Sequence, residues 1–402
     1  MNPELNKLHP YPFEKLALLK QGVTPDPDLN PIALSIGEPK HAAPQFVLDT
    51  LSQQLSGVSA YPLTKGLPEL RQAISNWLIQ RFNLPSDSLN ANDHVIPVNG
   101  TREALFAFAQ AVIDSSVDQD SPPLIVMPNP FYQIYEGAAY LAGAEPYFLN
   151  TTADNNYLPD FENVPTEVWQ RCQLVYLCSP GNPTGAVVDK DALRDLIHLA
   201  QKHDFIIASD ECYSEIYFDE SIPPTGLLET AAEMGNSHYE RCVVFHSLSK
   251  RSNLPGLRSG FVAGDKNILS QFLKYRTYHG CAMPVHHQLA SIVAWQDEEH
   301  VKENRAIYQK KFTDVINILS PVLDVTKPDA SFYLWLKTPG SDEDFAKNLF
   351  EKQNITVLPG SYLSREAHGI NPGNQHVRMA LVASYDECIE AAQRIRQFLD
   401  NY

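Results

Sequence analysis

Ser247-Leu-Ser-Lys-Arg-Ser-Asn-Leu-Pro-Gly-Leu-Arg-Ser-Gly260 follows the apolar run Cys242-Val-Val-Phe245. The apolar run predicts a buried strand, and the proline and glycine after it predict a turn. The exit of this strand therefore gathers the amine of Lys250 with two phosphate-type donors, the Ser247 hydroxyl and the Arg258 guanidinium. Such a set can hold a phosphorylated aldehyde, because the amine can form an imine with it. The alternative is a solvated basic turn, since short motifs also match by chance.

The order of these residues resembles the pyridoxal-phosphate lysine motif of the class I/II aminotransferases. In this chain the motif is Ser-x-x-Lys, with an arginine eight residues after the lysine and Ser-Gly directly behind it. The resemblance implies that Lys250 carries the cofactor as an imine and later transfers the substrate proton. It also implies that Ser247 and Arg258 bind the cofactor phosphate.

A second phosphate-binding feature follows the apolar segment Val95-Ile-Pro-Val98. The chain there reads as a strand, a glycine turn and a helix, and the first turn of a helix offers free N–H groups to an anion. Gly100, Thr101 and Arg102 match the family residues that bind phosphate. Arg102 could also reach a distal substrate carboxylate, and an ordinary arginine at a helix start is the competing interpretation.

Two more strand exits carry polar residues that match the family. Asp210 ends the apolar run that begins at Phe205, and the carboxyl ends of such strands face the ligand crevice of an α/β sheet. A carboxylate there keeps a pyridine nitrogen protonated, so that the ring accepts electrons; a helix cap is the alternative. The resemblance places Asn182, in Asn-Pro-Thr-Gly, and Tyr213 on the cofactor's phenolic oxygen, where Tyr213 helps to tune the pKa of the imine.

Aromatic residues match the family at two further places. Phe131, in Pro-Asn-Pro-Phe-Tyr, aligns with the ring that stacks on the cofactor's pyridine, and Tyr132 is the neighbour that could be confused with it. Tyr61, in Tyr-Pro-Leu-Thr-Lys-Gly, matches a tyrosine that reaches across a dimer interface to the neighbouring cofactor phosphate. The resemblance therefore implies a homodimer. Ordinary core aromatics are the alternative in both cases.

Two residues are candidates for binding the substrate carboxylate, together with Asn182. Gly37, in Gly-Glu-Pro, lets a backbone N–H approach a ligand closely, although a strand-ending turn would explain it as well. Arg378 lies in an apolar strand, and burying an unpaired guanidinium costs too much to be incidental. The resemblance implies that Arg378 grips the substrate α-carboxylate in a bidentate fork. A salt bridge to an internal Asp or Glu is the alternative.

These matches follow the family's order along nearly the whole chain, which chance does not produce. The resemblance implies an α/β fold of fold type I, with a mostly parallel seven-stranded sheet between helices and a smaller α+β domain. We expect an N-terminal arm with part of the small domain over residues 1–44, the large cofactor-binding domain over 45–290 and the small C-terminal domain over 291–402. The pattern also predicts one long helix from Pro284 to Leu319 and short strands at 322–326, 332–336, 355–358 and 376–381.

Composition disfavours several kinds of partner. The 402 residues include 31 Lys and Arg against 48 Asp and Glu, a net charge of −17, which argues against nucleic acid and anionic membranes. No run reaches the roughly 18 apolar residues of a membrane helix, and the first ten residues lack the pattern of a secretory signal. Six cysteines without a C-x-x-C pair indicate reduced thiols in a cytoplasmic protein. No metal site is expected.

The substrate is indicated by four shorter stretches. His9 to Leu16, Gly37 to His41, His279 to Pro284 and Arg378 to Ala383 together resemble the proteobacterial succinyldiaminopimelate aminotransferases. That resemblance implies transfer of an amino group between glutamate and N-succinyl-2-amino-6-oxopimelate, both polyanions, with Arg102, Lys40 and Lys65 as candidate extra cations. Aspartate or kynurenine aminotransferases, a carbon–sulfur β-lyase and a non-catalytic sensor that binds pyridoxal phosphate are the alternatives.

Overall fold

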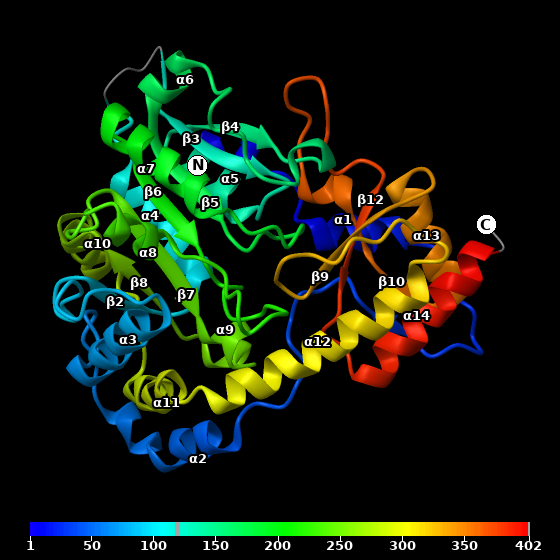
Figure 1. Cartoon of the computed structure of the whole chain (residues 1–402), viewed down its shortest axis with the longest axis horizontal. Coiled ribbons are helices and arrows are strands. Elements are labelled where there is room, and N and C mark those ends of the chain that lie inside the picture. Colours follow the sequence, from blue (N-terminus) through cyan, green and yellow to red (C-terminus); the bar gives the residue numbers. More distant parts are fainter. Residues whose placement is uncertain (117–120, 401–402) are drawn as a thin grey trace.

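The computed structural model describes residues 1–116 and 121–400, and within them a seven-stranded sheet dominates the fold (Figure 1). Its strands are β2 Val95–Val98, β3 Leu124–Asn129, β4 Glu145–Asn150, β5 Cys172–Cys178, β6 Ile206–Asp210, β7 Cys242–Ser247 and β8 Gly260–Gly264, in the spatial order β2-β8-β7-β6-β5-β3-β4. The pairs from β7 to β4 are parallel, whereas β8 runs antiparallel to both of its neighbours. The predicted large, mostly parallel sheet is therefore confirmed.

Helices cover both faces of this sheet because its strands are apolar on both sides. Alternate strand residues enter two different cores: Val175 and Val244 lie in one, and Tyr176 and Phe245 in the other. Helices α3 Pro68–Arg81, α7 Lys190–His203, α8 Leu227–Glu233 and α11 Val285–Gln296 contribute to the first core, and α4 Thr101–Val112, α5 Ile134–Leu141 and α10 Lys266–His279 to the second. Strand exits are thus left free at one edge of a three-layer sandwich.

A smaller unit is built on the antiparallel sheet β11-β12-β9, made of Leu358–Pro359, His376–Ala380 and Tyr333–Lys337. Strand β1 Ile32–Ala33 pairs in parallel with β10 Ile355–Thr356 beside it. Helices α12 Glu299–Leu319, α13 Asp342–Gln353 and α14 Tyr385–Asp400 pack on this unit around a core of its own. Figure 1 shows α12, in yellow, running from beside α11 to lie along α14.

The N-terminal residues join the two units. The short 3-10 helix Pro3–Lys7 packs on α5, whereas α1 Pro12–Leu19 packs on β11 of the smaller sheet. Helix α2 Gln45–Gln53 follows and packs on α11, and α6 Thr166–Arg171 precedes β5. The predicted domain limits at residues 44 and 290 stay predictions. Within the described part of the chain, no helix is both long and apolar enough to cross a membrane.

The long helix predicted from Pro284 to Leu319 is wrong, because two helices, α11 and α12, occupy that stretch. Asp297 between them has extended backbone angles, and its carboxylate accepts a hydrogen bond from the His300 N–H at 3.1 Å. The buried Arg251 guanidinium also takes the carbonyls of Ala294 and Asp297 at 2.7 and 3.1 Å. These carbonyls therefore do not need partners in a continuous helix.

Two predicted strands also differ from the structure. Residues 322–326 form no strand within the described chain, although Leu323 and Val325 pack against the small core. The segment 355–358 divides into β10 and β11, which belong to different sheets. Strand β4 was not predicted at all, because its mixed sequence Glu-Pro-Tyr-Phe-Leu-Asn is only partly buried at the edge of the large sheet.

Candidate active site

A cavity of about 460 Å³ lies where the strand exits of the large sheet face the smaller unit. This volume falls within the roughly 300–1,000 Å³ of small-molecule pockets, and the position is the ligand crevice of an open α/β sheet. The predicted site residues that line it are Gly37, Thr101, Arg102, Asn182, Asp210, Tyr213, Ser247, Lys250, Arg258 and Arg378. The fold therefore brings together residues that are up to hundreds of positions apart in the sequence.

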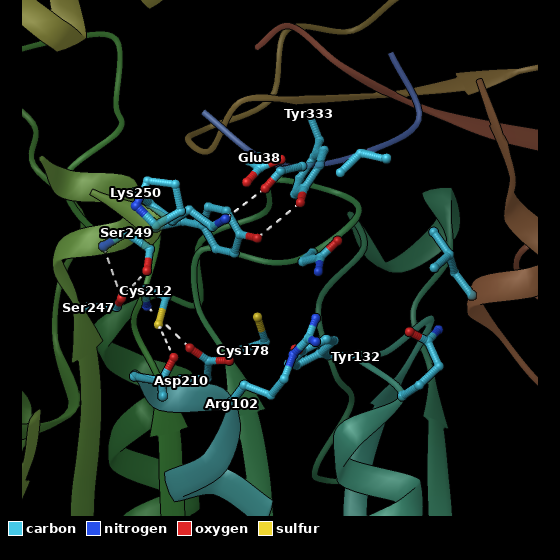
Figure 2. Close-up of a pocket in the computed structure, with 18 of the residues that line it drawn as sticks. Glu38, Arg102, Tyr132, Cys178, Asp210, Cys212, Ser247, Ser249, Lys250 and Tyr333 are labelled. Carbon is cyan, nitrogen blue, oxygen red and sulfur yellow. Dashed lines mark hydrogen bonds between the residues drawn. The ribbon is translucent and has the colours of Figure 1, made fainter. Parts of the chain in front are cut away.

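Lys250 projects into this cavity from a short helix, α9 Leu248–Arg251, that directly follows β7 (Figure 2). The Ser247 side chain caps the helix by accepting the N–H of Ser249 at 3.0 Å. The Lys250 amine donates to the Gly37 carbonyl at 2.6 Å. Burial lowers the pKa of Lys250 to about 8, and the cationic Arg378 acts in the same direction. The free amine is therefore available as a nucleophile near neutral pH.

This pKa predicts how Lys250 reacts in the cofactor-free chain. Only the neutral amine attacks an acylating reagent, so labelling of Lys250 by trace acetic anhydride should reach half its maximum near pH 8. Site-resolved mass spectrometry across pH 6 to about 11 measures this midpoint. A midpoint close to the ordinary lysine value of 10.5 would contradict the buried environment.

The start of α4 and the turn after α9 form one end of the cavity. Gly100 precedes α4 with φ 81°, and a β-carbon there would collide with the Arg258 guanidinium, so the position requires glycine. Arg258 donates to the carbonyls of Pro255 and Asn99 at 2.9 and 3.3 Å, and no carboxylate in the described chain pairs with it. The first N–H groups of a helix beside an arginine without an anion suit a phosphate.

A carboxylate lies deeper in the cavity. Asp210, the last residue of β6, accepts the Tyr135 hydroxyl at 2.7 Å and the Cys212 N–H at 3.3 Å. Burial raises the pKa of Asp210, while these two hydrogen bonds favour its ionised form. No cationic side chain of the described residues forms an ion pair with it. A positively charged ligand group would complete this environment.

The smaller sheet supplies the opposite wall. Arg378 in β12 donates to Asn182 Oδ1 at 3.0 Å and to the Ser35 carbonyl at 2.7 Å, and its buried Nε has no partner. Its guanidinium lies 4.5 Å from the centre of the Tyr333 ring. No ion pair with Arg378 occurs in the described chain, so the alternative of an internal salt bridge is wrong. An orphaned donor at a cavity wall is consistent with an anionic ligand.

Tyr213 and Tyr333 join the two walls, since their hydroxyls lie 3.0 Å apart. Burial raises the pKa of both Tyr213 and Tyr333, so both phenols stay protonated. A β-carbon on Gly37 would collide with the Tyr333 hydroxyl, which explains the glycine in Gly-Glu-Pro. Tyr333 was not among the residues predicted from the sequence, although strand alternation gives a signal, because Tyr333 lies two residues from Trp335, the register partner of Arg378.

The structure does not place the Phe131 ring, which the sequence predicted to stack on the cofactor, in the cavity. Phe131 is 1% exposed, packs on Phe148 at 5.1 Å and lies under Arg365, away from the cavity. The neighbouring Tyr132 lines the cavity instead, as Figure 2 shows. Adjacent residues outside a helix face different directions, and the sequence alone did not decide which ring faces the ligand.

Tyr61 lies outside the cavity of its own chain. Its side chain is fully exposed in a loop that precedes α3. Two residues that were not predicted from the sequence also line the cavity. They are Cys212, whose Sγ lies 3.0 Å from Thr101 Oγ1, and Tyr11, which comes from the N-terminal residues. Among residues 1–116 and 121–400, no group of three or more His, Cys, Asp or Glu side chains could hold a metal ion.

Comparison with known proteins identifies the family of this fold and site. The family model for class I and II aminotransferases matches residues 30–395. The chain belongs to the class I and II aminotransferases. An LL-diaminopimelate aminotransferase of Nitratidesulfovibrio vulgaris is 30% identical over 97% of both chains. These matches span nearly the whole chain, so the family assignment covers both the large and the small unit.

Two solved structures agree with the fold. An aminotransferase from Neisseria meningitidis Z2491 superposes with a TM-score of 0.94 at 50% identity, covering 99% of this chain and 100% of that one. The aminotransferase AspB of Helicobacter pylori 26695 gives a TM-score of 0.88 at 36% identity, over 98% and 100%. The chain is therefore a transaminase that depends on pyridoxal phosphate.

The residues of the cavity fit this cofactor. An amine with a lowered pKa, an uncovered helix start beside Arg258, and a buried carboxylate without a cation match its aldehyde, phosphate and ring nitrogen in turn. The predicted holding residues that line the cavity are Thr101, Arg102, Asn182, Asp210, Tyr213, Ser247, Lys250 and Arg258. Gly100 joins them through its contact with Arg258.

Proposed function

We propose that this aminotransferase exchanges an amino group between glutamate and N-succinyl-2-amino-6-oxopimelate, which makes it a succinyldiaminopimelate aminotransferase of lysine biosynthesis. The observation that carries the proposal is the presence of three guanidinium groups, Arg102, Arg258 and Arg378, in one cavity. One phosphate and one α-carboxylate account for two of them. The third then suits a substrate that carries a second, distal anion.

Arg102 is the candidate for that distal anion. Its Nε donates to the Tyr132 hydroxyl at 2.6 Å and its Nη2 to the Tyr11 hydroxyl at 3.2 Å. Both partners are neutral, so in the described chain the guanidinium has no counter-charge. The other two candidates, Lys40 and Lys65, do not line the cavity. Arg102 could therefore bind the γ-carboxylate of glutamate or the distal carboxylate of the acceptor.

The free diamino acid LL-diaminopimelate is the second candidate substrate. It is favoured by the names of relatives that are about 30% identical over most of this chain, several of which are LL-diaminopimelate aminotransferases. As amino donors, N-succinyl-LL-diaminopimelate and LL-diaminopimelate share the carbon chain and both carboxylates and differ only in the succinyl group on one nitrogen. The succinyl group adds a further anion, which fits a cavity rich in cations.

Each wall of the cavity has a role in the proposed reaction. Arg378 and the Gly37 N–H bind the substrate α-carboxylate, and Arg258, Ser247 and the start of α4 bind the cofactor phosphate. Lys250 removes the proton from the substrate Cα, and the same amine gives the proton back later in the reaction. Asp210 holds a proton on the ring nitrogen, and Asn182 with Tyr213 binds the phenolic oxygen. When bound, the cofactor supplies an electron sink for the carbanion at Cα.

A donor panel tests the substrate. Purified enzyme with 2-oxoglutarate as acceptor is given N-succinyl-LL-diaminopimelate, LL-diaminopimelate, aspartate, kynurenine and cystathionine, and glutamate, pyruvate and ammonia are measured. We expect kcat/KM for the succinylated donor to exceed that for LL-diaminopimelate by roughly tenfold or more, which is the effect of one extra charge-assisted hydrogen bond. Preference for the free diamino acid would favour the second candidate. Release of pyruvate and ammonia from cystathionine would indicate a lyase.

The variant Arg102→Gln tests which anion Arg102 binds. The amide can still contact the Tyr132 hydroxyl but carries no charge. Its kcat/KM should therefore fall for donors with a distal carboxylate and remain near the wild-type value for alanine. An equal loss for alanine would mean that Arg102 acts on the cofactor phosphate instead.

We also propose that the active enzyme is a homodimer in which Tyr61 completes the partner's site. The side chain is fully exposed, next to the exposed Leu63 and Val58, which leaves an apolar loop uncovered in the single chain. Mixing inactive Tyr61→Ala and Lys250→Ala subunits should restore about a quarter of wild-type activity per site, since mixed dimers carry one intact site. Activity that stays at zero after subunit exchange, verified by native mass spectrometry, would argue against a shared site.

A further inference from the structure

Helix α12 carries polar side chains on its buried face, an unusual composition for a helix that bridges two cores. Asn304 and Lys311 are buried, and they lie seven residues apart, on one side of the helix. His300 precedes Asn304 by one turn and places its Nε2 2.8 Å from Ser252 Oγ, just after the Lys250 helix. This face of α12 therefore contacts Ser252, just after the Lys250 helix, at one end, and the backbone of Leu381 and Ala383 in the smaller unit at the other.

Lys311 is bound without a carboxylate. Its ammonium donates to His41 Nε2 at 2.7 Å, to the Leu381 carbonyl at 3.2 Å and to the Ala383 carbonyl. No acidic side chain of the described residues forms an ion pair with it. Three acceptors use all three N–H bonds of the ammonium, so the group is fully satisfied without an ion pair. Two of these acceptors lie immediately beyond β12, the strand that carries Arg378.

The hydrogen bonds have a single direction from Lys311 to Lys250. An ammonium only donates, so His41 Nε2 must accept and its Nδ1 must carry the proton. Nδ1–H then donates to Asn304 Oδ1 at 2.7 Å, and Asn304 Nδ2 lies 3.5 Å from the Lys250 carbonyl. Asn253, three residues after Lys250, donates to the same Asn304 oxygen at 3.0 Å. Lys311, His41 and Asn304 thus form a continuous chain, which we name the α12 clasp.

The α12 clasp fixes one end of segment 35–41, and Lys250 and Arg378 contact the other end. Lys250 Nζ donates to the Gly37 carbonyl at 2.6 Å, and Arg378 Nη2 donates to the Ser35 carbonyl at 2.7 Å. His41 lies four residues beyond Gly37 and is fixed by the clasp from the other side. While the Lys250 amine is free, segment 35–41 is therefore held by Lys250 and Arg378 at one end, and α12 holds its other end.

We propose that the α12 clasp is a positioning device that sets the distance between the Lys250 amine and the Arg378 guanidinium by fixing segment 35–41. Lys311, His41 and Asn304 do not line the cavity and are positioning residues. Their role concerns how the bound amino acid is oriented for proton removal and does not depend on which acceptor the enzyme uses. A displacement of about 1 Å at a reacting group costs on the order of a hundredfold in rate.

Two variants at His41 separate positioning from stability. His41→Ala removes both hydrogen bonds, whereas the carboxamide of His41→Gln can accept from Lys311 and donate to Asn304. The test is a single-turnover reaction with glutamate, followed by the absorbance of the bound cofactor. We expect His41→Ala to raise the half-saturating glutamate concentration (the apparent KM) roughly tenfold or more and to lower the maximal rate constant severalfold. His41→Gln should recover most of this loss.

Tyr308→Phe is the matched control. Tyr308 lies on α12, its ring centre is 4.6 Å from that of His41, and its buried hydroxyl has no hydrogen-bond partner. Removing that hydroxyl should leave both kinetic constants within about twofold of wild type. Asn304→Leu breaks the clasp at a second place, so the double variant with His41→Ala should lose no more than the worse single variant.

Amide hydrogen exchange of the holoenzyme gives a readout that needs no substrate. Exchange in segment 35–41 should accelerate in His41→Ala and return to the wild-type rate in His41→Gln. Wild-type exchange and KM in His41→Ala would overturn the proposal, and so would equal losses of melting temperature in both His41 variants with unchanged KM. If the wild-type enzyme fails to react with glutamate, the proposed donor is wrong, whereas the exchange result still tests the clasp.

Discussion

Lys250→Ala is expected to reduce turnover at least about a thousandfold, because covalent attachment and proton transfer are lost together. The methyl group can neither bind the cofactor aldehyde nor carry the substrate proton. Cofactor should still bind, since the start of α4 and Arg258 are untouched. Steady-state turnover and equilibrium dialysis of the cofactor measure the two effects separately.

The fold of this variant should survive. Folding depresses the pKa of Lys250 from 10.5 to about 8, so the unfolded chain binds more protons between these values. The contribution of Lys250 to the free energy of unfolding therefore rises with pH across that interval. Below about pH 8 the buried ammonium lowers the stability of the folded chain. The cofactor-free alanine variant should be at least as stable as wild type at neutral pH. Lys266→Ala, at an exposed position on α10, is the control. Normal turnover in Lys250→Ala would refute the proposed role of Lys250.

The sequence predicted the cavity well because its residues occupy strand exits. Asp210 and Lys250 each follow an apolar run, and parallel strands of one sheet end at the same edge. The pattern therefore brings such residues together without any knowledge of side-chain contacts. Tyr135, which donates to Asp210, lies within a helix and carries no comparable signal.

Features that depend on tertiary contacts were harder to predict. The break between α11 and α12 follows from the Arg251 guanidinium, which comes from a segment more than 40 residues away and binds two helix-end carbonyls. The apolar run at 355–358 fits one strand by pattern, yet it changes partner from β1 to β12 in the folded chain. The choice between Phe131 and Tyr132 also depends on Phe148, a neighbour on β4.

Asp210→Asn is expected to lower kcat by roughly a hundred- to a thousandfold, the usual effect of removing a preorganised electrostatic group. The amide has the same shape and can still accept the Tyr135 hydroxyl, which lies 2.7 Å from the carboxylate. It cannot balance the charge of a protonated ring nitrogen, so the electron sink is weakened while binding is preserved. Single-turnover proton removal, with cofactor affinity measured in parallel, tests this separation.

Tyr135→Phe is the matched variant for the pH dependence of the same site. Burial already raises the pKa of Asp210, and the Tyr135 hydrogen bond counteracts that rise by favouring the ionised form. Losing the hydroxyl should raise this pKa further, so the acid limb of the kcat profile should move to higher pH. In Asp210→Asn no carboxyl remains to titrate, and the limb that belongs to Asp210 should vanish. An acid limb that is identical in wild type and both variants would mean that the Asp210 charge does not control the reaction.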